Sequence, residues 1–170
     1  FYLKPSLSAV NTQSKSPNDL IMMDQEEVAK SFNCEVYPYT KITSINRELK
    51  EISVDGDVYS YDYLVLATGA RPIEPDWLRV SENVMRVNHL EEYDAFYNRI
   101  HKDAEIAIIG GGLIGVEFAH DIAPCVKKVT LIEKAETLME TMLPKAFGEA
   151  LGNALEARGV DVKCCLLYTS

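Results

Sequence analysis

The sequence lacks the cysteine patterns that would indicate a disulfide scaffold or a zinc site. Its four cysteines form no C-x-x-C pair, and no group of cysteines and histidines has the spacing of zinc ligands. We therefore expect no metal site and a reducing, cytoplasmic setting. Cys34 and Cys125 are interpreted as packing or surface thiols. The three histidines, His89, His101 and His120, form no triad, and we expect none of them to be catalytic.

Long apolar runs and an excess of positive charge are also absent. No segment approaches the roughly 18 consecutive apolar residues of a membrane span. The net charge of −9 argues against nucleic acid or an anionic membrane as a partner, because both require a basic surface. No signal peptide is visible, and Phe1 is not an initiator methionine, so we expect the true N-terminus to be missing.

The most informative pattern is a strand followed at once by a glycine-rich turn. Ile106–Ile109 is a short β-branched run that predicts a strand buried on both faces. Gly110, Gly112 and Gly115 follow it in G-x-G-x-x-G spacing. In such a motif the first glycine allows a tight turn, the second lets a pyrophosphate approach the backbone, and the third lets helix and strand pack closely.

The residues after the glycines complete the context that this motif requires. A helix is predicted over 113–119, with its N-terminal amides facing phosphates, and a second buried strand over 129–132. Glu133 ends that strand, where a carboxylate can bind a ribose 2′-hydroxyl and disfavour the extra phosphate of NADP. Lys134 weakens that preference. The alternative, a glycine-rich turn in another α/β protein, does not explain the position of Glu133.

The chain continues with a predicted helix over 144–158 and a strand starting at 160–162. Pro144 suits the first turn of that helix and Gly159 its C-terminal cap. The resulting β-α-β-α-β order is half of a doubly wound sheet. Residues 165–170 continue no pattern, and we interpret them as a processing scar.

Upstream of residue 103 the pattern predicts a mostly antiparallel region. Asp55-Gly56 is a strong hairpin turn. The run 63–67 predicts a buried strand, and the small residues Thr68 and Gly69 after it allow a ligand or another backbone to come close; an ordinary turn is the alternative. Two helices are also expected, one from residue 18 or 19 to residue 32 and one over 90–100. The other expected strands cover residues 34–37, 41–46, 50–54, 58–61 and 83–87.

Three segments in fixed order resemble the FAD-dependent pyridine nucleotide-disulfide oxidoreductase superfamily: Tyr2-Leu-Lys-Pro-Ser-Leu-Ser8, Tyr61-Asp-Tyr-Leu-Val-Leu-Ala-Thr-Gly-Ala-Arg-Pro72 and Gly110-Gly-Gly-Leu-Ile-Gly-Val-Glu117. Family markers are Ala-Thr-Gly after an apolar strand and a glutamate two residues after the last glycine. The first segment lacks the cysteines of the disulfide-reducing, coenzyme A disulfide-reducing and NADH oxidase branches. It is instead similar to rubredoxin–NAD reductases and the reductases of flavorubredoxin.

The resemblance implies an α/β fold with two Rossmann-like FAD- and NAD(P)-binding domains, both incomplete. An antiparallel β-hairpin or meander is then inserted in the FAD part. Residues 1–102 are expected to be part of the FAD-binding domain without its N-terminal fingerprint. Residues 103–164 are expected to be the first part of the NAD-binding domain, and 165–170 a non-native tail. The sequence is thus interpreted as a fragment of a substantially longer reductase.

The resemblance also implies roles for single residues. Lys4 is expected at the N5 side of the isoalloxazine, where a cation stabilises the charge of the reduced ring, and Glu117 is expected near the nicotinamide, paired with Lys4. Lys4 on an ordinary surface loop, and Glu117 as an acid favoured near a helix N-terminus, are the alternatives. The expected cofactor ligands are Lys4, Pro5, Ile42, Ala67, Thr68 and Gly69 for FAD, and Gly110, Gly111, Gly112, Leu113, Ile114, Gly115, Glu117, Glu133 and Lys134 for NADH.

The implied function is transfer of electrons from NADH through FAD to a rubredoxin-type carrier protein. Rubredoxins are typically acidic, as this chain is, so a local basic patch would have to dock the carrier. Two alternatives remain open. One is another terminal acceptor, in a nitrite reductase or ferredoxin reductase component. The other is a non-catalytic flavoprotein that senses NADH.

Overall fold

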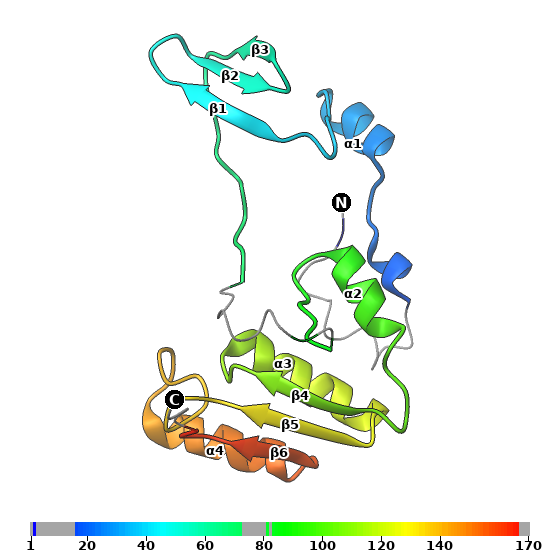
Figure 1. Cartoon of the computed structure of the whole chain (residues 1–170), viewed down its shortest axis with the longest axis vertical. Helices are drawn as coiled ribbons and strands as arrows, with labels where there is room; N and C mark the ends of the chain where they lie inside the picture. The colour runs from blue at the N-terminus through cyan, green and yellow to red at the C-terminus, as the bar shows by residue number, and fades with distance from the viewer. Residues whose placement is uncertain (1, 3–15, 73–80, 82, 167–170) are drawn as a thin grey trace. The chain divides into compact units, whose positions relative to one another are not determined.

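The computed structural model describes residues 2, 16–72, 81 and 83–166 and shows a mixed α/β chain (Figure 1). Contacts between Cα atoms divide it into two compact units. Of the described residues, 23–72 belong to one unit and 2, 16–22, 81 and 83–166 to the other. Among these residues no helix combines the length and the apolar character that crossing a bilayer requires.

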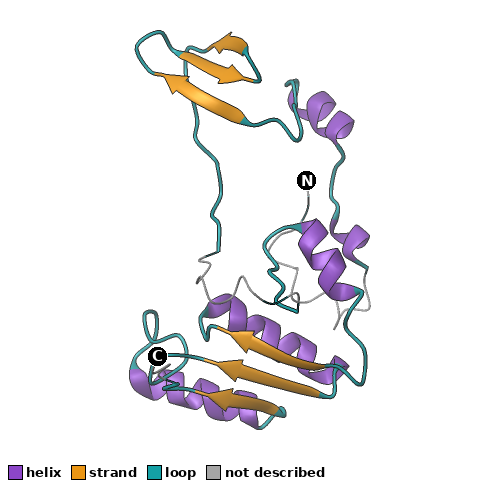
Figure 2. Cartoon of the chain, viewed as in Figure 1, coloured by secondary structure: helices purple, strands orange, loops and turns teal. Residues whose placement is uncertain are grey.

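The larger unit is built on a parallel sheet in the order β4-β5-β6. Its strands are β4 (Glu105–Ile109), β5 (Lys128–Ile132) and β6 (Val160–Lys163). Ile106 is opposite Val129, and Val129 is opposite Val160. Helix α3 (Leu113–Ile122) and the 3₁₀ turn η5 (Ala123–Cys125) connect the first two strands, and α4 (Lys145–Glu156) connects the last two (Figure 2). The predicted β-α-β-α-β order is confirmed.

The strand before the glycines is not buried on both faces, so that expectation is wrong. Side chains of β4 alternate between exposed and half-buried, and Ile109 is 49% exposed. On the central strand, Val129 and Leu131 are fully buried, while Thr130 and Ile132 are only half-buried. The physical reason is that the described helices α3 and α4 cover one face of the sheet, as right-handed crossovers that advance in one direction require.

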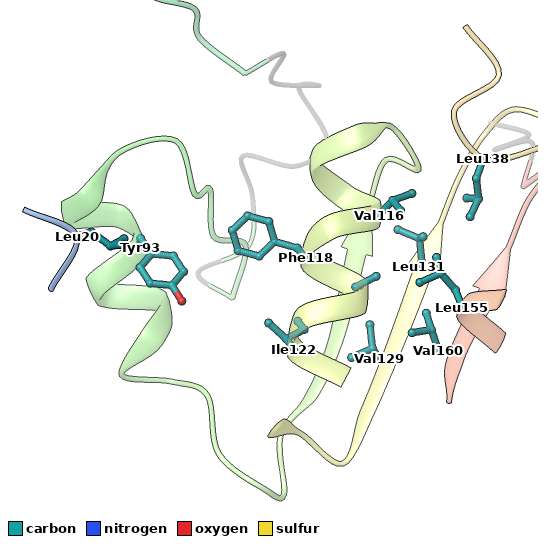
Figure 3. Close-up of a cluster of buried hydrophobic side chains, with 11 residues drawn as sticks. Leu20, Tyr93, Val116, Phe118, Ile122, Val129, Leu131, Leu138, Leu155 and Val160 are labelled. Atoms are coloured by element: carbon teal, nitrogen blue, oxygen red, sulfur yellow. The ribbon is translucent and has the colours of Figure 1, made fainter. Parts of the chain in front are cut away.

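The core of this unit lies between α3 and the sheet and extends to α2 (Leu90–Tyr97) and the 3₁₀ turn η3 (Pro17–Leu20) (Figure 3). Tyr93 of α2 is fully buried, and its ring centroid is 6.3 Å from that of Phe118 on α3. Burying an aliphatic or aromatic side chain of this size stabilises a fold by about 1.5–3 kcal/mol. Helix α2 was expected to reach residue 100 and ends three residues earlier.

The smaller unit contains an antiparallel sheet in the order β1-β2-β3, formed by β1 (Ile42–Asn46), β2 (Glu51–Val54) and β3 (Asp57–Ser60). Asp55 and Gly56 connect the last two strands with φ angles of 50° and 100°. Both angles are left-handed, as the tight hairpin turn predicted there requires. Helix α1 (Gln25–Phe32) precedes the sheet, and the Asp24 carboxylate caps it by accepting the Glu27 N–H at 2.8 Å.

Several predicted elements upstream of residue 103 are wrong. The helix expected to run from 18 or 19 to 32 is two elements, because Ser16 and Asp24 each begin a separate helical segment with a capping box. No strand forms at 34–37, 63–67 or 83–87. Tyr63 and Val65 are 93% and 83% exposed. A strand exists only through its hydrogen bonds to a neighbour, and no described segment pairs with 63–67.

Candidate dinucleotide-binding site

The glycine turn between β4 and α3 has the backbone geometry that its sequence predicts. Gly110 has φ 108°, a conformation that residues with a Cβ rarely adopt, and its N–H donates to the Ile132 carbonyl at 2.8 Å. A Cβ on Gly115 would collide with the Gly110 carbonyl oxygen. The first glycine therefore permits the turn, and the third lets α3 approach β4 closely.

Gly112 differs from these two glycines because no protein atom requires it. A Cβ added there meets nothing within 4 Å, and φ is an ordinary −77°. The residue is the N-cap of α3, where no side chain caps the helix. The first amides of a helix have no intrahelical acceptor and carry partial positive charge. The open space at Gly112 therefore fits the approach of a phosphate group.

Glu133 lies at the glycine turn, although 22 residues separate it from Gly111. One carboxylate oxygen accepts the Gly111 N–H at 2.5 Å, and the other accepts the Ala135 N–H at 2.9 Å. The residue is half-buried, and its own N–H donates to the Lys163 carbonyl at 2.8 Å. The structure thus brings together the glycines and the acid that the sequence predicts to form one site.

The other residues predicted for this site are exposed. Leu113 and Ile114 begin α3 at 46% and 64% exposure, and Glu117 is exposed one turn further along the helix. Lys134 is exposed directly after the acid. The predicted pairing of Glu117 with Lys4 involves a residue outside the described part of the chain, as does the prediction for Pro5.

Of the residues predicted to contact FAD, Ile42 and Ala67–Gly69 belong to the other compact unit. Ile42 begins β1 and is 45% exposed. Ala67, Thr68 and Gly69 lie in a segment without regular structure and are exposed, and Gly69 has φ 70°.

Sequence reasoning gave no role to the connection between β5 and α4, which contacts the glycine turn. The Met139 N–H donates to the Gly111 carbonyl at 2.8 Å, and Leu138 is fully buried. Cys164, which follows β6, also senses Glu133: burial, and to a smaller extent the negative charge of Glu133, raise the pKa of its thiol. The sequence shows in this connection the apolar residues Leu138, Met139, Met142 and Leu143, and these do not by themselves predict a partner.

Comparison with known proteins identifies, along nearly the whole chain, the same family that the sequence motifs resemble. Residues 1–166 match the pyridine nucleotide-disulphide oxidoreductase family. The chain is 31% identical over 162 residues to the nitric oxide reductase FlRd-NAD(+) reductase of Aliivibrio fischeri (strain ATCC 700601 / ES114). It is 35% identical over 161 residues to the protein of the same name from Escherichia coli O81 (strain ED1a). Each match covers 95% of this chain but only 42% of the relative.

Solved structures show the same fold. Putidaredoxin reductase, in its covalent complex with putidaredoxin, has a TM-score of 0.86 at 25% identity over 96% of this chain and 40% of that protein. A ferredoxin reductase from Rhodopseudomonas palustris has a TM-score of 0.85 at 24% identity, covering 99% of this chain and 42% of that one. Since the family match extends over far more than half of its residues, the chain belongs to the pyridine nucleotide-disulphide oxidoreductase family.

Proposed function

We propose that this chain is part of a longer cytoplasmic, NADH-dependent, FAD-containing reductase that delivers electrons to a rubredoxin-type carrier protein. Family membership and the FlRd-NAD(+) reductase relatives imply FAD and NAD(H) as its cofactors. The main observation in support of NADH as the electron donor is the position of Glu133, whose carboxylate lies at the glycine turn. Residues 1–102 are proposed to belong to the FAD part, 103–164 to the NAD part, and 165–170 to a non-native tail.

Each group at the glycine turn has a task in binding NADH. The open backbone at Gly112 and the first amides of α3 take the pyrophosphate. A carboxylate has roughly four lone-pair positions, so the two N–H groups already bound to Glu133 leave capacity for the ribose hydroxyls. A 2′-phosphate at that position would meet the negative charge of the carboxylate, and NADPH is therefore disfavoured.

The flavin side of the proposal depends on Lys4 and Glu117. When bound, FAD supplies a ring that takes up a hydride and releases electrons singly. The Lys4 ammonium is proposed to lie beside this ring, where positive charge stabilises the reduced form. The exposed Glu117 carboxylate is proposed to pair with Lys4 and fix its position. Ile42 and Ala67–Gly69 are proposed to contact the same cofactor through their backbone.

A small electron-carrier protein is the proposed acceptor, and rubredoxin is its most specific form. The curated relatives are reductases of FlRd by name, which supports this choice. Ferredoxin is the second candidate, because one protein of the same fold is named a ferredoxin reductase. The net charge of −9 on this chain would repel an acidic carrier, so docking needs a local patch of basic residues.

Steady-state oxidation of NADH by the full-length protein tests this proposal. The assay compares purified rubredoxin, purified ferredoxin and no added carrier. We expect rapid turnover with rubredoxin and slow turnover without a carrier. Faster turnover with ferredoxin would assign the second candidate. NADH binding without turnover on either carrier would indicate a sensing flavoprotein and contradict the proposed reductase.

A further inference from the structure

The connection between β5 and α4 contacts the glycine turn through hydrogen bonds that leave both polar groups of Gly111 engaged. The Gly111 N–H donates to Glu133 at 2.5 Å, and its carbonyl accepts the Met139 N–H at 2.8 Å. Gly111 itself is buried. A Cβ there would lie 2.9 Å from the Glu133 Cβ and 2.6 Å from a Leu138 methyl. The residue between the first two motif glycines is therefore enclosed by this connection.

Met139 lies at a turn of that connection and has an unusual backbone conformation. Its φ of 52° is left-handed, which is uncommon for a residue with a long side chain. Its carbonyl accepts the N–H groups of Met142 at 2.8 Å and Leu143 at 2.9 Å. The preceding Leu138 is fully buried in the core cluster (Figure 3). Such a conformation persists only where the surroundings determine it, and such residues gather at functional sites.

We propose that Met139 is a positioning residue for the dinucleotide site and acts through its backbone N–H. The inference rests on the proposed binding of NADH. The Met139 N–H binds the carbonyl on one side of the Gly111 Cα, and the N–H on the other side of that Cα donates to the Glu133 carboxylate, so this bond restrains the residue that holds the acid. The next residue, Gly112, begins α3. One bond therefore sets both the ribose-binding acid and the place where the pyrophosphate approaches.

The test replaces Met139 in the full-length protein and measures binding of NADH and NADPH directly by calorimetry. Met139→Pro removes the N–H and forces a negative φ. We expect the dissociation constant for NADH to rise by about tenfold or more, as the loss of a buried hydrogen bond implies. NADPH binding should weaken less than NADH binding, because NADPH shares the pyrophosphate position but gains from a displaced Glu133, whose charge no longer opposes the 2′-phosphate. Met139→Gly keeps the N–H, suits the left-handed φ, and is expected to bind NADH as tightly as the wild type.

Met142→Pro is the matched control, because it also removes one N–H from the same turn, at a side chain that is 61% exposed. Its bond goes to Met139 and not to the glycine turn. We expect it to leave the ratio of NADH to NADPH affinity unchanged. Thermal unfolding of each variant separates loss of the fold from loss of position.

Two results overturn the inference without touching the proposed function. One is wild-type preference for NADH in Met139→Pro that remains folded. The other is an equal loss of preference in Met142→Pro, which would mean that any disturbance of the turn suffices. If Met139→Pro does not fold, Met139→Gly still decides, since weaker NADH binding by that variant contradicts a role for the backbone alone. Failure of the wild-type protein to bind NADH would instead contradict the proposed function.

Discussion

At the residue scale, the fold requires two of the three motif glycines, each for a different physical reason, and leaves the third unconstrained. Gly110 is fixed by its left-handed φ, and Gly115 by contact with the Gly110 carbonyl. Gly112 has neither constraint, so the space above it is available to a ligand. The sequence spacing predicted all three positions, but only coordinates separate the two glycines that the fold requires from the one with open space beside it, where we propose that the pyrophosphate binds.

Alanine substitutions at two of these glycines should therefore affect different properties, one mainly stability and the other mainly NADH binding. Gly115→Ala is expected to destabilise the protein by about 1–3 kcal/mol, as overpacking does. Gly112→Ala is expected to cost about 1 kcal/mol or less, through the weaker helix cap, yet to weaken NADH binding strongly. Urea unfolding and NADH titration of both variants check this. Normal NADH binding by Gly112→Ala would contradict the proposed position of the pyrophosphate beside Gly112.

At the element scale, the parallel βαβαβ unit could be predicted because each of its elements carries a local signal. Gly159 has a left-handed φ of 90° in the turn before β6, although the C-cap of α4 is Ala157 and not Gly159 as predicted. The apolar faces of α3 and β5 have the expected periods. The run 63–67 could not be judged in this way. Its apolar residues predict burial, but a strand needs a neighbour, and pairing between distant segments leaves no local signal.

Helix α4 offers a matched pair of glycines for testing how it packs. A Cβ on Gly148 would lie 2.5 Å from the Leu138 carbonyl oxygen, whereas one on Gly152 meets nothing within 4 Å. Gly152→Ala is expected to stabilise the protein by about 0.5–1 kcal/mol, because alanine loses less backbone entropy in a helix. Gly148→Ala is expected to destabilise it. Equal unfolding midpoints for the two variants would contradict the packing of α4 against residue 138.

Ion pairs between neighbouring segments make a small, pH-dependent contribution. Glu105 on β4 accepts a hydrogen bond from Lys127 at 2.6 Å, and this bond, followed by the lysine charge, lowers the pKa of the carboxyl below its ordinary value of 4.5. A lowered carboxyl pKa means stability that is present above 4.5 and is lost as the pH falls through the lowered value.

The variant Glu105→Gln isolates this contribution. It should unfold slightly more easily than the wild type at neutral pH, and the difference should disappear in acid, where both proteins have a neutral group at this position. Thermal unfolding measured across this pH range is the check. A difference that stays constant with pH would mean that the carboxylate charge does not stabilise the fold.

At the scale of the whole molecule, the chain spans 42% of the length of its curated relatives, and the residues proposed for its two cofactors lie in different parts of it. Of the residues proposed to bind NADH, Gly111 and Glu133 are joined by a hydrogen bond at the glycine turn. The flavin residues Ile42 and Ala67–Gly69 are exposed in the other compact unit. Both groups of residues were predicted from the sequence. The NADH group follows from a local motif, whereas the FAD group follows only from resemblance to a family, because its residues come from separate segments.

Lys4 belongs to this scale, because its proposed role depends on the complete flavin site. Lys4→Ala in the full-length protein should slow reduction of the flavin by NADH in stopped-flow experiments, since the reduced ring loses a stabilising positive charge. Lys4→Arg keeps the charge and serves as the control. Bleaching of the flavin at the wild-type rate in Lys4→Ala would leave the lysine with a structural role only.

The central claim is that Glu133 selects NADH as the electron donor, and the rate of flavin reduction by NADH relative to NADPH tests it most directly. In anaerobic stopped-flow experiments on the full-length protein, the wild type should react much faster with NADH. In Glu133→Arg this preference should be lost or reversed, because a cation replaces the acid at the ribose. Retention of the wild-type preference by Glu133→Arg would contradict the account.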